Sequence, residues 1–202
     1  MPPPEGPSVP DPPASGPAPG RAPFRHTGDE VRVEGWRITV VRGSFVAPDG
    51  TPFTRDIVRH PGAVAVVPVT DHGTVLLVRQ YRGPVDRELL EIPAGTRDVD
   101  GEDPARTAAR ELEEEVGVRA GRLVRLGAVL NSPGFCDEET VLFLARDLEP
   151  GERSGHGEEE RFLDVVEVPL ADVDALVAEG VLTDAQTVLG LLLARPHLGP
   201  AQ

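Results

Sequence analysis

The sequence predicts an α/β (α+β) fold, with a mixed β-sheet, one helix in the middle of the chain and two helices near its end. Three observations support this prediction. Residues 62–69 are continuously apolar, as in a strand that is buried on both faces. Residues 104–116 have apolar side chains at helical spacing. Residues 171–179 and 183–195 have the pattern of amphipathic or buried helices.

The composition restricts the class of protein. A chain of 202 residues with 39% hydrophobic residues can form one domain with appendages. Its formal net charge of -14 argues against a nucleic-acid-binding surface, which needs basic residues. The single cysteine, Cys136, excludes an internal disulfide and fits a reducing cytosol. No apolar run approaches the roughly 20 residues of a membrane span, and no signal peptide is apparent, so we expect a cytoplasmic protein without membrane contact.

The first part of the chain divides into a tail and a β-rich extension. Residues 1–27 are expected to be a disordered tail, because they hold ten of the 22 prolines and almost no large apolar residue. Residues 28–58 are expected to form an antiparallel hairpin or small sheet. So few strands are not stable alone, and they must pack on the main domain, residues 59–202, or on a second subunit. The elements expected here are strands at 36–42 and 53–58 and a turn at 47–50.

The main domain is expected to alternate strands with turns before and after its central helix. The residues Pro93-Ala94-Gly95 read as a loop whose backbone can approach a ligand closely. Besides the strand at 62–69 and the helix at 104–116, the expected elements are strands at 75–78, 89–92, 123–130, 140–145 and 163–168.

The central helix carries acidic side chains on one face. Pro104 suits its first turn and Gly117 its end. Glu111, Glu114 and Glu115 are three and four residues apart, so their carboxylates lie close together. Like charges at this spacing cost roughly 0.2–0.5 kcal/mol per pair. A hard divalent cation such as Mg²⁺, which takes oxygen ligands, would turn that cost into a gain. Taken alone, the run more often indicates a solvated acidic helix face than a metal site.

The residues around this acidic face resemble the Nudix box. That motif reads Gly, five residues, Glu, seven residues, Arg-Glu, an apolar residue, any residue, Glu-Glu, any residue, Gly and an apolar residue. The run RELEEEVGV at 110–118 matches its second half, and Glu102 stands at the required distance before it. Six residues instead of five separate Gly95 from Glu102, which we interpret as one extra residue in loop 96–101, with Gly101 allowing the turn.

Four more stretches resemble the bacterial ADP-ribose pyrophosphatase branch of this family. They are RHPGAV at 59–64, RQYR at 79–82, EIPAG at 91–95 and SPG at 132–134, so that the resemblance covers roughly residues 28–195. It implies the Nudix fold, in which a mixed sheet lies between helices. It also implies hydrolysis of ADP-ribose, or a related ADP-sugar, to AMP and ribose 5-phosphate, with Mg²⁺ as cofactor or Mn²⁺ in its place.

The resemblance assigns metal ligands and substrate contacts to individual residues. Glu111 and Glu115 would bind Mg²⁺ directly, the backbone carbonyl of Ala94 would be a third ligand, and Glu114 would act through water. Arg82 suits a bidentate phosphate clamp, although a surface ion pair is the alternative for it. The substrate-binding residues would be Arg82, Arg59, Gly95 and Pro133.

The resemblance also assigns the catalytic groups. Glu159 would be the catalytic base, acting together with Glu114 and with Arg110, which can orient its neighbouring glutamates. Because Glu159 lies within a run of three glutamates, Glu158 and Glu160 remain alternatives for the base.

Several choices stay open at this point. Trp36 and Tyr81 are expected in the core, with stacking on adenine as the alternative for each. The substrate could be another nucleoside diphosphate compound, such as a GDP-sugar or NADH, and a Nudix fold can also bind a nucleotide without cleaving it. The resemblance further implies a homodimer in which residues 28–58 contribute to the interface.

Overall fold

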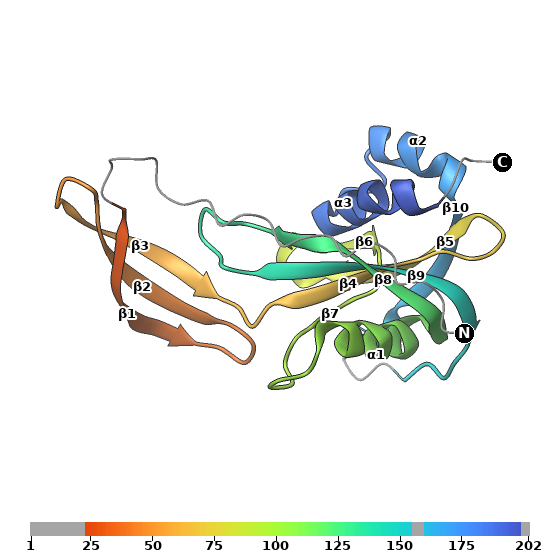
Figure 1. The fold of residues 1–202 in the computed structure, drawn as a ribbon, viewed down its shortest axis with the longest axis horizontal. Coiled ribbons are helices and arrows are strands. Elements are labelled where there is room, and N and C mark those ends of the chain that lie inside the picture. Colours follow the sequence, from red (N-terminus) through yellow and green to blue (C-terminus); the bar gives the residue numbers. More distant parts are fainter. Residues whose placement is uncertain (1–22, 155–159, 199–202) are drawn as a thin grey trace, which may run out of the picture. The chain divides into compact units, whose positions relative to one another are not determined.

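The computed structural model describes residues 23–154 and 160–198 of the chain (Figure 1). The chain divides into two compact units. The first comprises Met1–Pro61 together with Ser132–Glu138, and the second comprises Gly62–Asn131 and Glu139–Gln202. Most of the predicted tail, up to residue 22, lies outside the described residues.

The described part of the first unit is built on an antiparallel sheet with the order β1-β2-β3. Its strands are β1 (Arg25–Glu34), β2 (Thr39–Val46) and β3 (Pro52–Arg59). Phe45 and Phe53 face each other across β2 and β3, and their rings stack with centroids 5.3 Å apart. The expected antiparallel extension is therefore confirmed.

Two details of this sheet differ from the prediction. β1 begins at Arg25, so residues 25–27 belong to the sheet although they were assigned to the tail. The strand expected at 36–42 begins only at Thr39, because Gly35 starts a turn in which its amide donates to the carbonyl of Ile38 at 2.9 Å. Trp36 lies in this turn and is 90% exposed, so the expectation that it packs in a core is wrong.

The second unit contains two sheets. One has the order β7-β4-β9-β8, in which β4 and β9 are parallel and the other pairs are antiparallel. The other has the order β10-β5-β6 and is antiparallel. The strands are β4 (Ala63–Pro68), β5 (Thr74–Arg82), β6 (Arg87–Glu91), β7 (Ala94–Thr96), β8 (Val118–Leu130), β9 (Glu139–Pro150) and β10 (Asp164–Pro169).

Helices cover both faces of the four-stranded sheet, with α1 on one side and α2 and α3 on the other (Figure 1). Alternate residues of β4 point to opposite faces, as the pleat requires. Val64 and Val66 pack in a cluster with α1, whereas Ala65 and Val67 pack in a cluster with α3. The helices are α1 (Pro104–Val116), α2 (Val173–Ala178) and α3 (Ala185–Ala194), with short 3-10 turns η1 (Gly83–Val85), η2 (Glu160–Phe162), η3 (Leu170–Asp172) and η4 (Arg195–His197).

The predicted mixed sheet between helices is thus confirmed, and the strand expected at 62–69 is buried throughout β4. The sequence missed β7, a short strand where a loop was expected, and it made β8 and β9 too short. The added parts of β8 and β9 carry charged or exposed residues, which weaken the apolar signal of a strand, and β7 has only three residues. Within the described residues, no helix has the length and apolar character needed to cross a membrane.

The loop Ser132–Glu138 connects β8 and β9 but belongs to the first unit. It extends the hydrogen bonding of β3 through a parallel bridge between Val58 and Cys136. The amide of Val58 donates to the carbonyl of Phe135 at 2.8 Å, and the amide of Asp137 donates to the carbonyl of Val58 at 3.2 Å. The SPG stretch at 132–134 therefore belongs to the same unit as the N-terminal sheet.

Candidate metal-binding and active site

Helix α1 begins and ends where its sequence specifies. The side chain of Asp103 caps the helix by accepting from the amide of Ala105 at 2.8 Å, and Pro104 occupies the first turn. Gly117 ends the helix in the left-handed conformation with φ 77°, which glycine adopts without strain. These local signals fix the two ends of the helix, and helical spacing then determines which glutamates share a face.

The buried face of α1 includes two carboxylates. Glu111 is 9% exposed and Glu115 is 5% exposed, whereas Glu113 and Glu114 are half-buried. A buried carboxylate is costly unless hydrogen bonds or positive charge compensate for lost water. Two glutamates one helical turn apart on a buried face therefore require a partner, which the adjacent strand and one arginine supply.

The backbone of β7 is the first partner. The amide of Ala94 donates to Oε2 of Glu115 at 3.0 Å. Gly95 lies directly against Glu111, because a Cβ atom on Gly95 would stand 2.0 Å from Cδ of that side chain. Two of the three residues of the predicted ligand-binding loop, Ala94 and Gly95, thus contact the two buried carboxylates, one each.

Arg110 is the second partner. Its guanidinium lies 2.8 Å from Oε1 of Glu111 and 3.2 Å from Oε2 of Glu114, and its Nη2 lies 3.5 Å from Oε2 of Glu102. Burial alone would lower the pKa of Arg110, but the charges of these glutamates outweigh it and raise the pKa above its ordinary value. Arg110 therefore remains a cation and draws three box glutamates together.

The longer loop at 96–101 still delivers Glu102 to the helix. Gly101 takes φ 74°, so the turn expected at this glycine is confirmed. The carboxylate of Glu102 accepts from Oγ1 of Thr107 at 2.9 Å in addition to its contact with Arg110. Sequence reasoning did not single out Thr107, which is fully buried and whose hydroxyl faces Glu102 across the first turn of α1.

Arg82 is paired with a buried carboxylate. Its Nε and Nη2 both donate to Glu91, with Nη2 2.6 Å from Oε2, and Glu91 is only 4% exposed. Burial alone would lower the pKa of Arg82, but the bonds to Glu91 and the charges of Glu115 and Asp184 raise it. The surface ion pair considered from sequence is therefore a half-buried one, and Glu91 is a partner that sequence reasoning missed.

A cavity of about 560 Å³ lies beside the more exposed side of α1. It touches two box residues, Arg110 and Glu114, and extends to Ser154. The amide of Ser154 donates to the carbonyl of Glu114 at 3.1 Å, which satisfies a carbonyl at the C-terminal end of the helix. The remaining lining residues are Ala109, Glu113, Arg119, Ala120, Glu152 and Arg153.

The donor set of α1 fits a hard divalent cation. Carboxylates and backbone carbonyls are the ligands that such ions take, and Gly95 leaves Glu111 the space that a Cβ atom would fill. In the described part of the chain, no three His, Cys, Asp or Glu side chains are gathered as a metal site. Arg110 contacts Glu111 and Glu114, and the amide of Ala94 donates to Glu115.

The other predicted site residues lie elsewhere. Glu158 and Glu159 are outside the described residues, and Glu160 begins η2. Arg59 and Pro133 belong to the first unit. Tyr81 is 43% exposed and its hydroxyl donates to Asp86 at 2.8 Å, so its expected core position is wrong.

Comparisons with known proteins agree with the resemblance to the Nudix family. Residues 59–189 match the family model described as the NUDIX domain. The chain is 44% identical over 144 residues to an ADP-ribose pyrophosphatase of Bacillus subtilis, which covers 71% of this chain and 77% of that protein. It is 39% identical over 169 residues to an ADP-ribose pyrophosphatase of Mycobacterium tuberculosis, which covers 84% of this chain and 82% of that protein.

A solved structure agrees as well. The "Crystal structure of ADP compounds hydrolase" superposes with a TM-score of 0.77 at 25% identity, covering 90% of this chain and 97% of the other. The domain match spans well over half of the chain and contains the helix with its glutamates. This chain therefore belongs to the Nudix family.

Proposed function

We propose that this Nudix protein is a divalent-metal-dependent pyrophosphohydrolase that cleaves ADP-ribose, or a related ADP-sugar, to AMP and ribose 5-phosphate. One observation carries the proposal: the backbone of Ala94 and Gly95 meets the buried carboxylates of Glu115 and Glu111. A solvated acidic helix face would not bury these groups or place a glycine against one of them. The names of the two pyrophosphatase relatives support the choice of substrate.

The metal would be held by α1 and β7. Glu111 and Glu115 would be direct ligands, the carbonyl of Ala94 a third, and Glu114 would act through water. A bound Mg²⁺, or Mn²⁺ in its place, supplies charge that neutralises the pyrophosphate and polarises the phosphorus under attack. Arg110 would orient Glu111 and Glu114, which its contacts with both support.

The remaining groups would act on water and substrate. Glu159 would accept the proton of the attacking water, and Ser154, five residues earlier in the chain, is bonded to the backbone of Glu114. Arg82 would bind phosphate on the side of its guanidinium that faces away from Glu91. Gly95 and Pro133 would approach the substrate through backbone and ring. Arg59 is bound by Asp29 and Asp137 within the first unit.

The oligomer and the location are proposals of the same kind. A homodimer would cover part of the N-terminal sheet, in which every residue of β1 is exposed. The single cysteine fits a cytoplasmic protein. Light scattering on the purified protein tests the first of these, and a monomer would remove it.

The deciding experiment measures AMP release from ADP-ribose with Mg²⁺, with Mn²⁺ and with a chelator, beside ADP-glucose, GDP-mannose and NADH. We expect metal-dependent turnover with preference for ADP-ribose. Preference for GDP-mannose or NADH would keep the chemistry and change the substrate. Absence of hydrolysis for all four, with binding of one, would replace the enzyme by a nucleotide-binding module.

A further inference from the structure

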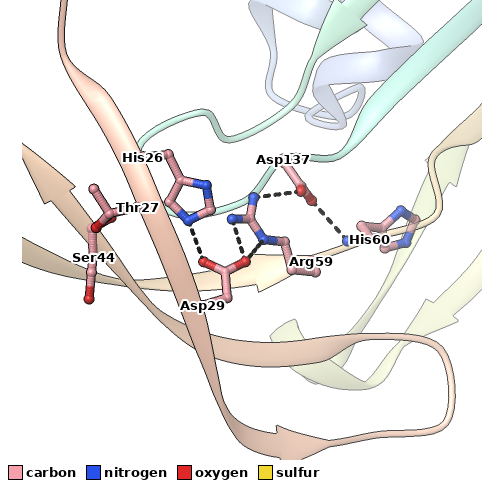
Figure 2. Close-up of polar contacts among 7 residues, drawn as sticks. All are labelled: His26, Thr27, Asp29, Ser44, Arg59, His60 and Asp137. Atoms are coloured by element: carbon pink, nitrogen blue, oxygen red, sulfur yellow. Dashed lines mark hydrogen bonds and ion pairs between the residues drawn. The ribbon is translucent and has the colours of Figure 1, made fainter.

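Arg59 is the centre of a polar network within the first unit (Figure 2). Its Nε and Nη2 donate to Oδ2 of Asp29 at 3.0 and 2.8 Å, and its Nη1 donates to Oδ2 of Asp137 at 2.9 Å. All three nitrogens of the guanidinium are thus bound to carboxylate oxygens. The side chain is 33% exposed, so these are neither fully solvated nor fully buried contacts.

The two carboxylates are themselves fixed by other groups. Oδ1 of Asp29 lies 2.6 Å from Nε2 of His26, on the same strand. Oδ1 of Asp137 accepts from the amide of His60 at 2.9 Å. Each aspartate therefore uses one oxygen for Arg59 and the other for a second donor, which leaves little freedom for the guanidinium to rotate away.

The charges of the network reinforce one another. Burial alone would raise the pKa of Asp29, but the bonds from Arg59 and His26 lower it. Burial would likewise raise the pKa of Asp137, but the bonds from His60 and Arg59 lower it. The pKa of Arg59 is raised, first by its bond to Asp137, so all three groups are charged at neutral pH.

The network joins three segments that are far apart in the sequence. Asp29 lies on β1, Arg59 ends β3, and Asp137 lies in the loop Ser132–Glu138. The backbone bonds between Val58 and this loop run alongside it. Arg59 is therefore the side chain that fastens the loop, and Pro133 within it, to two strands of the N-terminal sheet.

We propose that Arg59 is a positioning residue: by bridging Asp29 and Asp137 it holds the loop Ser132–Glu138 on the N-terminal sheet, and it affects substrate binding through that loop without touching the substrate. Three of the five N–H groups of the Arg59 guanidinium are already bound to Asp29 and Asp137, and the two negative charges of these carboxylates oppose an anionic phosphate beside them. The proposal rests on the proposed function only in giving Pro133 a part in substrate binding.

The kinetic test compares Arg59→Gln, Asp137→Asn and the double variant with wild type. Asn at 137 keeps the oxygen that accepts from His60 but turns an NH₂ group toward Nη1 of Arg59, so it breaks the bridge specifically. We expect each single variant to raise KM for ADP-ribose about tenfold, the size expected when a hydrogen bond to a charged group is lost, with kcat within about twofold of wild type. The double variant should be no worse than either single variant, because both break one bridge.

Two further variants sharpen the result. Arg59→Lys keeps the charge but cannot bridge two carboxylates with a planar fork, so it should resemble Arg59→Gln. Glu30→Gln removes a carboxylate from the same strand as Asp29, where it pairs with Arg32 outside the network, and should leave KM unchanged. An Asp137→Asn variant with the KM of wild type, beside a defective Arg59→Gln and a rescued Arg59→Lys, would overturn the proposal in favour of direct contact.

A second measurement does not depend on activity. Amide hydrogen exchange of Val58 and Asp137 reports the attachment of the loop to β3, because their amides form the hydrogen bonds between the two segments. Exchange of Phe135 reports the turn within the loop, because its amide donates to the carbonyl of Ser132. Exchange in 132–138 should rise in Arg59→Gln and Asp137→Asn but not in Glu30→Gln. Unchanged exchange in both network variants would refute the bridge. A wild-type protein that fails to hydrolyse ADP-ribose would refute the proposed function. The hydrogen-exchange measurement would still test whether Arg59 holds the loop on the N-terminal sheet.

Discussion

Gly95 and Glu111 lie in such close contact that the addition of one methyl group at position 95 would disrupt their arrangement. A Cβ atom at Gly95 would stand 2.0 Å from Cδ and 2.3 Å from Oε1 of Glu111. Real Cβ atoms do not approach other atoms so closely, so any side chain at position 95 must displace the carboxylate or the strand. The glycine of the EIPAG stretch thus sets the position of a proposed metal ligand.

Replacing Gly95 by Ala should therefore damage activity more than stability. Glu111 would be pushed away from β7, and we expect kcat/KM for ADP-ribose to fall at least about a hundredfold, the scale that misplacement of a catalytic group by about 1 Å can cause. The Mg²⁺ concentration needed for half-maximal rate should rise as well. A Gly95→Ala enzyme with wild-type rate and metal dependence would show that Glu111 does not bind the metal.

A substitution at Glu115 should remove activity without changing the stability of the fold. In Glu115→Gln one side-chain oxygen remains to accept from Ala94, so the melting temperature should stay close to that of wild type. The charge needed for metal binding is lost, and nearly all AMP release should disappear. Glu149→Gln, an exposed glutamate on β9, is the matched control and should keep full activity. Equal turnover by wild type and Glu115→Gln would remove Glu115 from the metal site.

The sequence was sufficient to predict the bounds of α1, because the residues that determine them lie in the helix or next to it. Asp103, Pro104 and Gly117 determine the ends of the helix, and helical spacing then determines which glutamates share a face. The sequence predicted only some of the contacts that those glutamates make. The resemblance pointed to Ala94 and Gly95, but the burial of Glu111 and the role of Thr107 depend on how β7 and the first turn of α1 pack.

Features that depend on distant residues could not be predicted. Arg59 is 30 residues from Asp29 and 78 residues from Asp137, and no local pattern links them. Trp36 was expected in a core because large apolar side chains are usually buried. A small sheet has too few covering elements to bury every such side chain, and the turn that carries Trp36 leaves the ring in solvent.

Glu113 occupies a variable position of the box and has a role that can be measured. Its Oε1 lies 3.3 Å from the amide of Glu152, which donates to it, and 3.4 Å from Nη1 of Arg119. A Cβ atom on Gly151 would stand 2.8 Å from the same oxygen, so the carboxylate packs closely on this segment. Glu113→Ala should lower the free energy of unfolding by about 1 kcal/mol, the value of one hydrogen bond.

Chemical denaturation of Glu113→Ala, beside Glu149→Ala as a control, measures this difference. Because the segment 151–154 leads toward Glu159, we also expect kcat to fall while KM for ADP-ribose changes little. A variant with wild-type stability and kcat would show that Glu113 is an ordinary surface glutamate.

The aspartates around Arg59 predict how the first unit responds to acid. The pKa values of Asp29 and Asp137 lie below their ordinary value of 3.8 in the folded protein. A carboxyl group whose pKa is lower when folded stabilises the fold above its unfolded pKa, and this contribution disappears as the pH falls through the folded pKa. The N-terminal sheet should therefore be unaffected between pH 7 and about pH 5 and weaken below about pH 4.

Amide exchange of β1 and β3 measured from pH 7 to pH 3, corrected for the intrinsic rate, checks this expectation. Asp137→Asn should flatten the change in 132–138, because it lacks one of the titrating groups. Weakening of the sheet already between pH 7 and pH 5 would contradict the assignment of this response to Asp29 and Asp137.

Trp36 is the only tryptophan of the chain, and its exposure leaves stacking on adenine as the remaining alternative. The guanidinium of Arg37 lies 4.4 Å from the ring centroid on one face, which supports the ring without burying it. If the ring stacks on adenine, ADP-ribose should quench its fluorescence in the Glu115→Gln variant, whereas ribose 5-phosphate should not. Trp36→Ala should then raise KM about tenfold, within the roughly 1–3 kcal/mol of one base–aromatic stack, and leave the melting temperature unchanged because no packing is lost. Fluorescence that does not respond to saturating ADP-ribose would leave Trp36 as a surface residue without a part in adenine recognition.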